Sequence, residues 1–169
     1  MAGFLFRKSL VTKDEPTLLY FIIDNSDAVQ IGDAMYINTD GHAGIATAGI
    51  KVTGIVAQVV DKNGIAVDPD SGTTDTYTVE SDNETDKMWK VGLICSQDAL
   101  FSNDADDDLA TTNLMQFFNV IDENTIDASD GGDTSGQFQL VSLDPDGDGD
   151  ASKGLFKIAE SQFSPHALA

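Results

Sequence analysis

The sequence contains little positive charge. Only nine of its 169 residues are lysine or arginine, with Arg7 the single arginine, and 29 are acidic, so the formal net charge is −20. A protein that neutralises phosphate groups needs a cluster of cations, and the sequence has no such stripe. It therefore predicts no binding to nucleic acid and none to an anionic membrane.

Cysteine and long apolar runs are also scarce. The only cysteine, Cys95, excludes an intrachain disulfide, and its apolar neighbours predict a small buried side chain. The longest unbroken apolar run, 18–23, is far shorter than the ~20 residues that cross a bilayer. At the N-terminus the basic residues follow the apolar patch, which is not the order of a secretory signal. We expect a protein that stays in the cytoplasm where it is made.

Residues for catalysis are few. The two histidines, His42 and His166, have no partner that the sequence makes evident. The sequence shows no nucleophile elbow, phosphate-binding loop or zinc spacing. These observations predict a protein that is not an enzyme.

Aspartate is abundant, with 24 aspartates against five glutamates, and it clusters with glycine between short apolar runs. Aspartate favours turns because its short side chain accepts hydrogen bonds from nearby backbone N–H groups, whereas glutamate favours helices. The pattern predicts an all-β fold: one compact antiparallel β-sandwich or barrel-like domain, with an extended N-terminal arm and long acidic loops. The expected arm is 1–16 and the expected domain is 17–169, with a possible loop subdomain at 96–136.

Several runs have the period of strands. Residues 18–23 are apolar throughout, which predicts a strand buried on both faces, and 52–60 predict a long central strand. The sequence Asp61-Lys62-Asn63-Gly64 predicts a hairpin that returns through 65–67, because Asn-Gly tolerates positive φ. Residues 88–95 place alternate apolar side chains on one face of a strand.

The N-terminal segment carries apolar residues directly before a basic pair, and two readings of it stay open. It can pack on its own domain, as an edge strand, or it can reach out to a neighbouring subunit. The second reading predicts a partner-binding segment formed by Phe4, Leu5, Phe6, Arg7 and Lys8. Adjacent Phe117 and Phe118 must face opposite sides of a strand, which also indicates a second layer or an interface between subunits.

The sharpest local motif is the acidic stretch 144–150. It places aspartates at the first, third and fifth positions of a calcium loop and glycine at the sixth, but Leu155 stands where an EF-hand needs glutamate. Two alternatives remain: a looser calcium site, or a solvated hairpin turn. The candidate ligands are Asp144, Asp146, Asp148 and Asp150. Calcium is therefore a possible cofactor, but the sequence indicates no cofactor that the protein requires. Weaker candidate metal ligands are Asp104 to Asp108 and the trio Asp127, Asp130 and Asp133.

Four segments give the chain a resemblance to the small capsid decoration, or cement, proteins of tailed bacteriophages. They are the N-terminal Phe-Leu-Phe-Arg-Lys, residues 30–36, residues 52–56 and the closing 153–158, which follows the acidic hairpin. The likeness is one of overall character over most of the chain and does not rest on a single motif.

This resemblance implies a structural virion protein that binds the outer surface of an icosahedral capsid and stabilises contacts between subunits of the major capsid protein. It further implies a homotrimer, no active site, and assembly inside the host cytoplasm. Binding would use an added β-strand and apolar burial. The main alternative is a calcium-dependent β-sandwich module that binds a carbohydrate or a cell surface.

Overall fold

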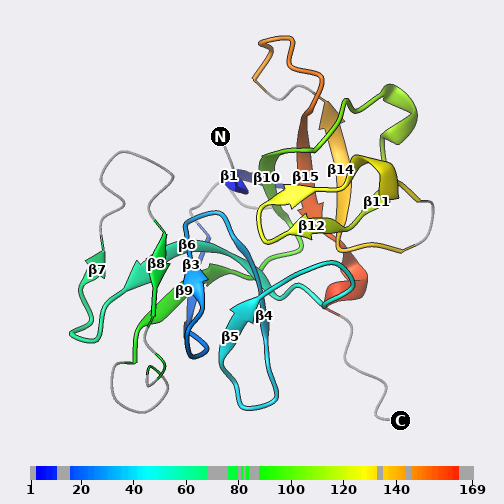
Figure 1. The fold of residues 1–169 in the computed structure, drawn as a ribbon. Coiled ribbons are helices and arrows are strands. Elements are labelled where there is room, and N and C mark those ends of the chain that lie inside the picture. The colour runs from blue at the N-terminus through cyan, green and yellow to red at the C-terminus, as the bar shows by residue number, and fades with distance from the viewer. Residues whose placement is uncertain are drawn as a thin grey trace.

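The chain folds into antiparallel β-structure, as seen in a computed structural model that describes residues 3–10, 16–67, 76–79, 81, 83, 88–132, 135–143 and 146–163 (Figure 1). Strands dominate these segments, and short 3₁₀ turns such as η2 (Thr111–Asn113), η3 (Ala128–Asp130) and η4 (Glu160–Gln162) join them. The predicted all-β fold is confirmed. None of the helices in these segments has the length and apolar character needed to span a bilayer.

The strands are short, as the frequent turn residues predict. In chain order they are β1 (Leu5–Ser9), β2 (Leu18–Ile22), β3 (Ala28–Val29), β4 (Ala34–Ile37), β5 (Ala43–Ile45), β6 (Gly54–Val60), β7 (Ala66–Val67), β8 (Tyr77–Thr78), β9 (Lys90–Ile94), β10 (Ala99–Asp104), β11 (Phe117–Phe118), β12 (Val120–Asp122), β13 (Thr125–Ile126), β14 (Phe138–Leu143) and β15 (Lys153–Ile158).

Two open sheets form the framework. One has five strands in the order β1-β10-β15-β14-β11, and the other has six, in the order β2-β9-β6-β4-β5 with β7 added to β6. The two-stranded pairs β3-β8 and β12-β13 accompany them. In the described residues neither sheet closes into a barrel, so the fold is sandwich-like, although the two edges of the six-stranded sheet meet at one point, where Ile23 after β2 bridges Ala43 of β5.

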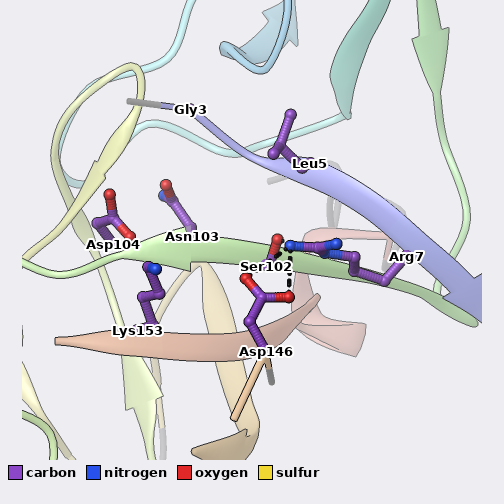
Figure 2. Close-up of a pocket in the computed structure, with 8 residues that line it drawn as sticks. All are labelled: Gly3, Leu5, Arg7, Ser102, Asn103, Asp104, Asp146 and Lys153. Carbon is purple, nitrogen blue, oxygen red and sulfur yellow. Dashed lines mark hydrogen bonds and ion pairs between the residues drawn. The ribbon is translucent and has the colours of Figure 1, made fainter. Parts of the chain in front are cut away.

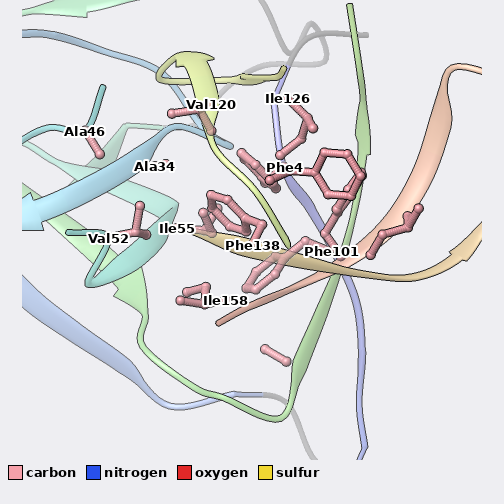
Figure 3. Close-up of a cluster of buried hydrophobic side chains, with 14 of the residues drawn as sticks. Phe4, Ala34, Ala46, Val52, Ile55, Phe101, Val120, Ile126, Phe138 and Ile158 are labelled. Atoms are coloured by element: carbon pink, nitrogen blue, oxygen red, sulfur yellow. The ribbon is translucent and has the colours of Figure 1, made fainter. Parts of the chain in front are cut away.

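The first core joins the sheets and is rich in phenylalanine (Figure 3). The Phe4 ring stacks on Phe138 with centroids 4.3 Å apart and meets the Phe101 ring edge-on at 6.4 Å. Phe118 and Phe156 form a further edge-to-face pair at 6.3 Å. Such pairs add stability beyond the area they bury. The six-stranded sheet contributes Ala34, Ile55 and Ile94 to this core.

A second core covers the other face of the six-stranded sheet. Val91 and Leu93 are buried there, and Trp89 and Cys95 pack against them, which confirms the predicted apolar face of 88–95. Burial raises the pKa of the Cys95 thiol to about 11, so it stays protonated at neutral pH. The strand predicted in 52–60 is central, because β6 pairs with both β9 and β4.

The Asn63-Gly64 turn forms as predicted. The Asp61 N–H donates to the Ile65 carbonyl at 2.9 Å, and Gly64 adopts a φ of +80°. Strand β7 then returns antiparallel to β6, with Val59 opposite Val67.

The expectation that 18–23 form a strand buried on both faces is wrong. Among the described strands β2 pairs with β9 alone, and beyond its end Ile23 forms a single bridge to Ala43. Leu19 and Tyr20 are 49% and 50% exposed. An apolar run indicates which residues can be buried. Which strand lies at the edge depends on the strand order of the whole sheet.

Residues from 96–136, which the sequence suggested as a possible loop subdomain, form part of the two sheets and of the core. They supply β10 to the five-stranded sheet and the buried side chains Phe118, Val120 and Ile126 to the first core. Of the adjacent phenylalanines, Phe118 is fully buried, and Phe117 is half-buried.

A close backbone contact attaches the N-terminal segment to the six-stranded sheet. The Phe4 N–H donates to the Gly32 carbonyl at 2.8 Å, and the Gly32 N–H donates to Val56 at 2.8 Å. Gly32 has a φ of +95°, and a Cβ there would lie 2.9 Å from the Phe4 nitrogen. Glycine is therefore required at this position for both its conformation and its lack of a side chain.

The next residue, Asp33, is a buried carboxyl group. Its Oδ2 accepts a hydrogen bond from the Gln30 N–H at 2.7 Å, whereas its Oδ1 has no partner among the described residues. Burial is the main reason that the pKa of Asp33 is raised to about 7; the Gln30 hydrogen bond opposes this shift, and the neighbouring Glu123 carboxylate adds to it. The β12-β13 turn is fixed to this point, since the Ala34 N–H donates to the Glu123 carbonyl.

We expect Asp33→Asn to make the protein more stable at neutral pH. The pKa of Asp33 is higher in the folded state than its ordinary value of 3.8. Asp33 therefore does not reduce the free energy of unfolding below pH ~4, and the reduction grows as the pH rises to about 7. The loss reaches up to about 4 kcal/mol, and the amide, which cannot ionise, avoids it. Thermal unfolding at pH 5 and pH 8 measures this: the variant should gain more at pH 8, and an equal effect at both values would contradict it.

Candidate partner-binding site at the edge of the five-stranded sheet

The structure brings together two segments that the sequence singled out separately. The N-terminal strand β1 and the acidic loop before β15 line the same small cavity of about 80 Å³ (Figure 2). Strand β10 forms its floor. The lining residues are Gly3, Leu5, Arg7, Ser102, Asn103, Asp104, Asp146 and Lys153.

Strand β1 packs on its own domain. It pairs antiparallel with β10, and the register shift between Phe6 and Lys8 leaves Arg7 as the extra residue of a bulge. Phe4 is 1% exposed in the first core, and Phe6 packs against that core. Leu5 and Arg7 line the cavity, and the Lys8 side chain lies outside the described part of the molecule.

Arg7 connects this strand to the acidic loop. Its Nε donates to Ser102 Oγ at 2.7 Å, and its Nη2 donates to Asp146 Oδ2 at 2.9 Å with Oδ1 also at 2.9 Å. The Arg7 and Asp146 side chains are 39% and 37% exposed, so the pair is partly screened by water. Arg7 therefore fixes the position of the loop relative to β1.

Lys153 binds the other end of the loop. Its ammonium group contacts the Asp148 carboxylate and lies 3.8 Å from Asp150 Oδ2. The Asp148 hydrogen bond raises the pKa of Lys153. Hydrogen bonds from Ser152 to Asp150, at 2.7 Å from the hydroxyl and 3.1 Å from the N–H, lower the pKa of Asp150.

These contacts show that cations of the protein already bind the candidate calcium ligands. Of the four candidate ligands, Asp146, Asp148 and Asp150 contact cations of their own chain, and Asp144 lies outside the described residues. A calcium ion bound by these carboxylates would have to displace Arg7 or Lys153 from them.

Asn103 is a site residue that the sequence did not indicate. It is 3% exposed, and neither its amide nitrogen nor its amide oxygen has a hydrogen-bond partner within the described residues. It lies opposite Gly154 in the register of β10 and β15. A buried amide without partners is unfavourable by ~1–3 kcal/mol, but nothing in the sequence distinguishes Asn103 from an exposed strand residue.

Three of the weaker metal-ligand candidates accept hydrogen bonds from neighbouring segments of the protein. Asp127 accepts from the Ser129 N–H at the start of η3, and Asp106 accepts from the Ala128 N–H at 2.8 Å. Asp130 accepts from the side chain of Asn119. These three carboxylates stabilise turns and 3₁₀ structure, while Asp133 lies outside the described residues.

The structure also brings His42 close to Asp24, 18 positions earlier in the sequence. His42 Nδ1 lies 4.0 Å from Asp24 Oδ1, and the Asn38 side chain donates to that oxygen at 2.8 Å. Asn38 Oδ1 accepts from the His42 N–H, so the cluster organises the β4-β5 hairpin. His166 is outside the described residues.

Comparison with known proteins gives no relative: no protein-family model, curated protein or solved structure matches this chain significantly.

We expect Phe4→Ala to destabilise the domain by about 3–5 kcal/mol, because it removes an aromatic side chain from a packed core. The neighbouring Leu10, which is 55% exposed, provides the matched control. Leu10→Ala should change the free energy of unfolding by less than ~0.5 kcal/mol. Urea unfolding measures both, and equal effects would show that Phe4 does not act through the core.

We expect calcium to stabilise Lys153→Met more than it stabilises the wild-type protein. The substitution frees Asp148 and Asp150 from their cation, so the carboxylates become available to a divalent ion. The measurement is the shift in melting temperature between excess EDTA and millimolar calcium chloride. A larger shift in the wild-type protein would contradict competition between Lys153 and the ion.

Proposed function

We propose that this chain is a structural protein of a virus particle, which binds the outer surface of an icosahedral capsid and stabilises contacts between subunits of the major capsid protein. The observation that carries the proposal is the placement of β1, an edge strand, beside a cavity where its residues Leu5 and Arg7 are presented. An edge strand offers backbone N–H and C=O groups to a partner chain.

The distribution of charge supports the same proposal. Negative charge lies mainly on loops, where it keeps an assembly soluble, while the adjacent cations Arg7 and Lys8 belong to the edge strand. Arg7 already pairs with Asp146, so a partner surface with carboxylates would be complementary to this edge through Lys8. The resemblance of the sequence to capsid decoration proteins points in the same direction.

A homotrimer on the capsid exterior, assembled in the host cytoplasm, is the form of the protein that we propose. Each subunit would contact the capsid through one sheet edge. The threefold symmetry of the trimer would place the three edges in equivalent orientations. We further propose that the chain has no catalytic activity and requires no cofactor.

The calcium-dependent binding module is the less supported candidate. The three described carboxylates of the acidic loop contact Arg7 or Lys153, which gives that loop a role in positioning β1 within its own domain.

We expect the purified protein to be a trimer of about 54 kDa, three times the 18.0 kDa chain. Size-exclusion chromatography with light scattering measures the mass directly. A stable monomer at micromolar concentration would remove the trimer from the proposal.

We expect Lys8→Glu to weaken binding to shells of the major capsid protein from the same virus by about tenfold, or ~1.4 kcal/mol. Lys157→Glu changes the net charge equally but lies on β15, inside the sheet, and should bind as the wild-type protein does. Co-sedimentation with the shells measures affinity, and cryo-electron microscopy measures occupancy. Absence of wild-type protein from the shell surface would reject the proposed function.

A further inference from the structure

Asp33 lies where three parts of the chain meet. In the N-terminal segment the Phe4 N–H donates to the carbonyl of the residue before Asp33 at 2.8 Å, and in β6 the Val56 N–H donates to the Asp33 carbonyl at 2.9 Å. The third part is the turn of the β12-β13 hairpin, where the Glu123 carbonyl accepts from the Ala34 N–H at 2.6 Å. A change of structure at Asp33 therefore affects all three parts.

The N-terminal side of this junction is packed backbone on backbone. Gly3 and Gly32 have φ angles of +104° and +95°, and a Cβ added to Gly3 would lie 3.3 Å from the Gly32 Cα. Two glycines in such close contact leave no space into which this side could shift. The hairpin is therefore the part of the junction that can move.

The β12-β13 hairpin is held firmly at its base and weakly at its turn. Val120 and Ile126, at the base, are fully buried in the first core (Figure 3), and the Val120 N–H donates to Gln137 Oε1 at 2.8 Å. Residues 122–125 are only half-buried, and among the described residues a single backbone hydrogen bond, donated by Ala34, joins them to a segment outside the hairpin. The turn can therefore swing away while its base stays in place.

The Asp33 carboxyl group is buried without an opposite charge. It is 0% exposed, and within the part of the chain that the structure describes its Oδ1 has no hydrogen-bond partner and it forms no ion pair. Its charged neighbour is Glu123, in the hairpin turn, and the Gln30 and Asn124 side chains beside it are neutral. The contacts from β6 and from the N-terminal segment are made by residues without a titratable side chain. Burial, with a smaller contribution from Glu123, raises the pKa of Asp33 to about 7.

The protonation state of Asp33 decides whether it attracts or repels the turn. A protonated carboxyl group has an O–H that can donate to a neighbouring carboxylate, so a proton between Asp33 and Glu123 favours their contact. Two ionised carboxylates in a buried site repel each other, and each is more stable when water reaches it. Moving the turn outward separates the charges and hydrates the Asp33 Oδ1, at the cost of the hydrogen bond from Ala34.

We propose that residues 122–125 form a pH-sensitive latch, which is closed over the junction when Asp33 is protonated and opens when Asp33 ionises. The structure shows the closed state, with the hydrogen bond from Ala34 to Glu123 in place. Because Phe4 is bonded to the same turn as Asp33, opening brings water to the attachment point of β1. The latch does not rest on the proposed function, because it requires no partner.

The direction of the pH dependence follows from the two states. Asp33 has a pKa of about 7 in the closed state, and we expect its ordinary value of 3.8 when the turn is open and water reaches it. The ratio of open to closed molecules is therefore constant below pH ~4, rises with pH between these two values, and is constant again above pH ~7.

Hydrogen exchange of the Ala34 amide tests the latch, because this N–H is released when the turn opens. Its exchange rate in D₂O, divided by the intrinsic rate at each pH, gives the open fraction. We expect this fraction to increase about tenfold or more between pH 5 and pH 7, and to be unaffected by dilute urea because the opening is local. An open fraction that does not change with pH, or exchange of Ala34 only at the rate of the β9 amides, through global unfolding, would overturn the inference.

Two variants and a matched control identify the carboxyl groups. Asp33→Asn cannot ionise, so its open fraction should change less than about twofold over the same range. In Glu123→Gln the Asp33 carboxyl carbon, followed by ¹³C NMR, should titrate at a lower pH than in the wild-type protein. Glu160→Gln makes the same change in net charge on the exposed η4 turn, and its Asp33 should titrate as in the wild-type protein.

Either of two results would show that Asp33 does not operate the latch. One is an Asp33→Asn variant that keeps the wild-type increase in exchange. The other is a wild-type Asp33 that titrates below pH 5, and this measurement decides the question even if a variant does not fold.

Calcium distinguishes a proton from a metal ion as the group that closes the latch. Exchange of the wild-type protein at pH 7 is compared in excess EDTA and in millimolar calcium chloride. We expect the Ala34 amide to exchange equally in both solutions. If calcium restores the protection measured at pH 5, a divalent ion bridges Asp33 and Glu123, and the inference fails.

Discussion

The stacking of Phe4 on Phe138 is the contact on which the arrangement of the site depends. It inserts the start of the N-terminal segment between the two sheets, and the Gly32 contact holds the adjacent backbone. With Phe4 fixed in this way, β1 must run along β10, and Arg7 must emerge next to the acidic loop. The aromatic core thus positions an edge strand, a cation and an aspartate loop through one buried ring.

Aspartate has two roles in this molecule. At Asp61, Asp127 and Asp150 the carboxylate accepts hydrogen bonds from the turn that follows it, which stabilises short connections between strands. At Asp33 the carboxyl group is instead buried beside Glu123, where its charge is costly. The same residue type therefore stabilises the surface and stores electrostatic strain at the junction of the sheets.

Much of the fold could be predicted from local patterns. The β6-β7 hairpin and the apolar face of β9 follow from Asn-Gly turn chemistry and from the period of a strand. The candidate site was less accessible, because its parts were identified one by one and the pairing of Arg7 with Asp146 joins residues 139 positions apart. Asn103 and the His42 and Asp24 pair gave no signal, since their significance comes from burial and proximity alone.

The sequence by itself determined the all-β character, the positions of turns and the anionic surface, because these depend on the preferences of each residue and its near neighbours. Only the tertiary structure decided that β2 pairs with β9 alone among the described strands, that Phe4 belongs to the core, and that the Asp33 carboxyl group is buried beside Glu123. The physical reason is that strand order and burial depend on contacts between residues far apart in the sequence. Strands pair and sheets pack in the arrangement that buries the hydrophobic surface of the whole chain.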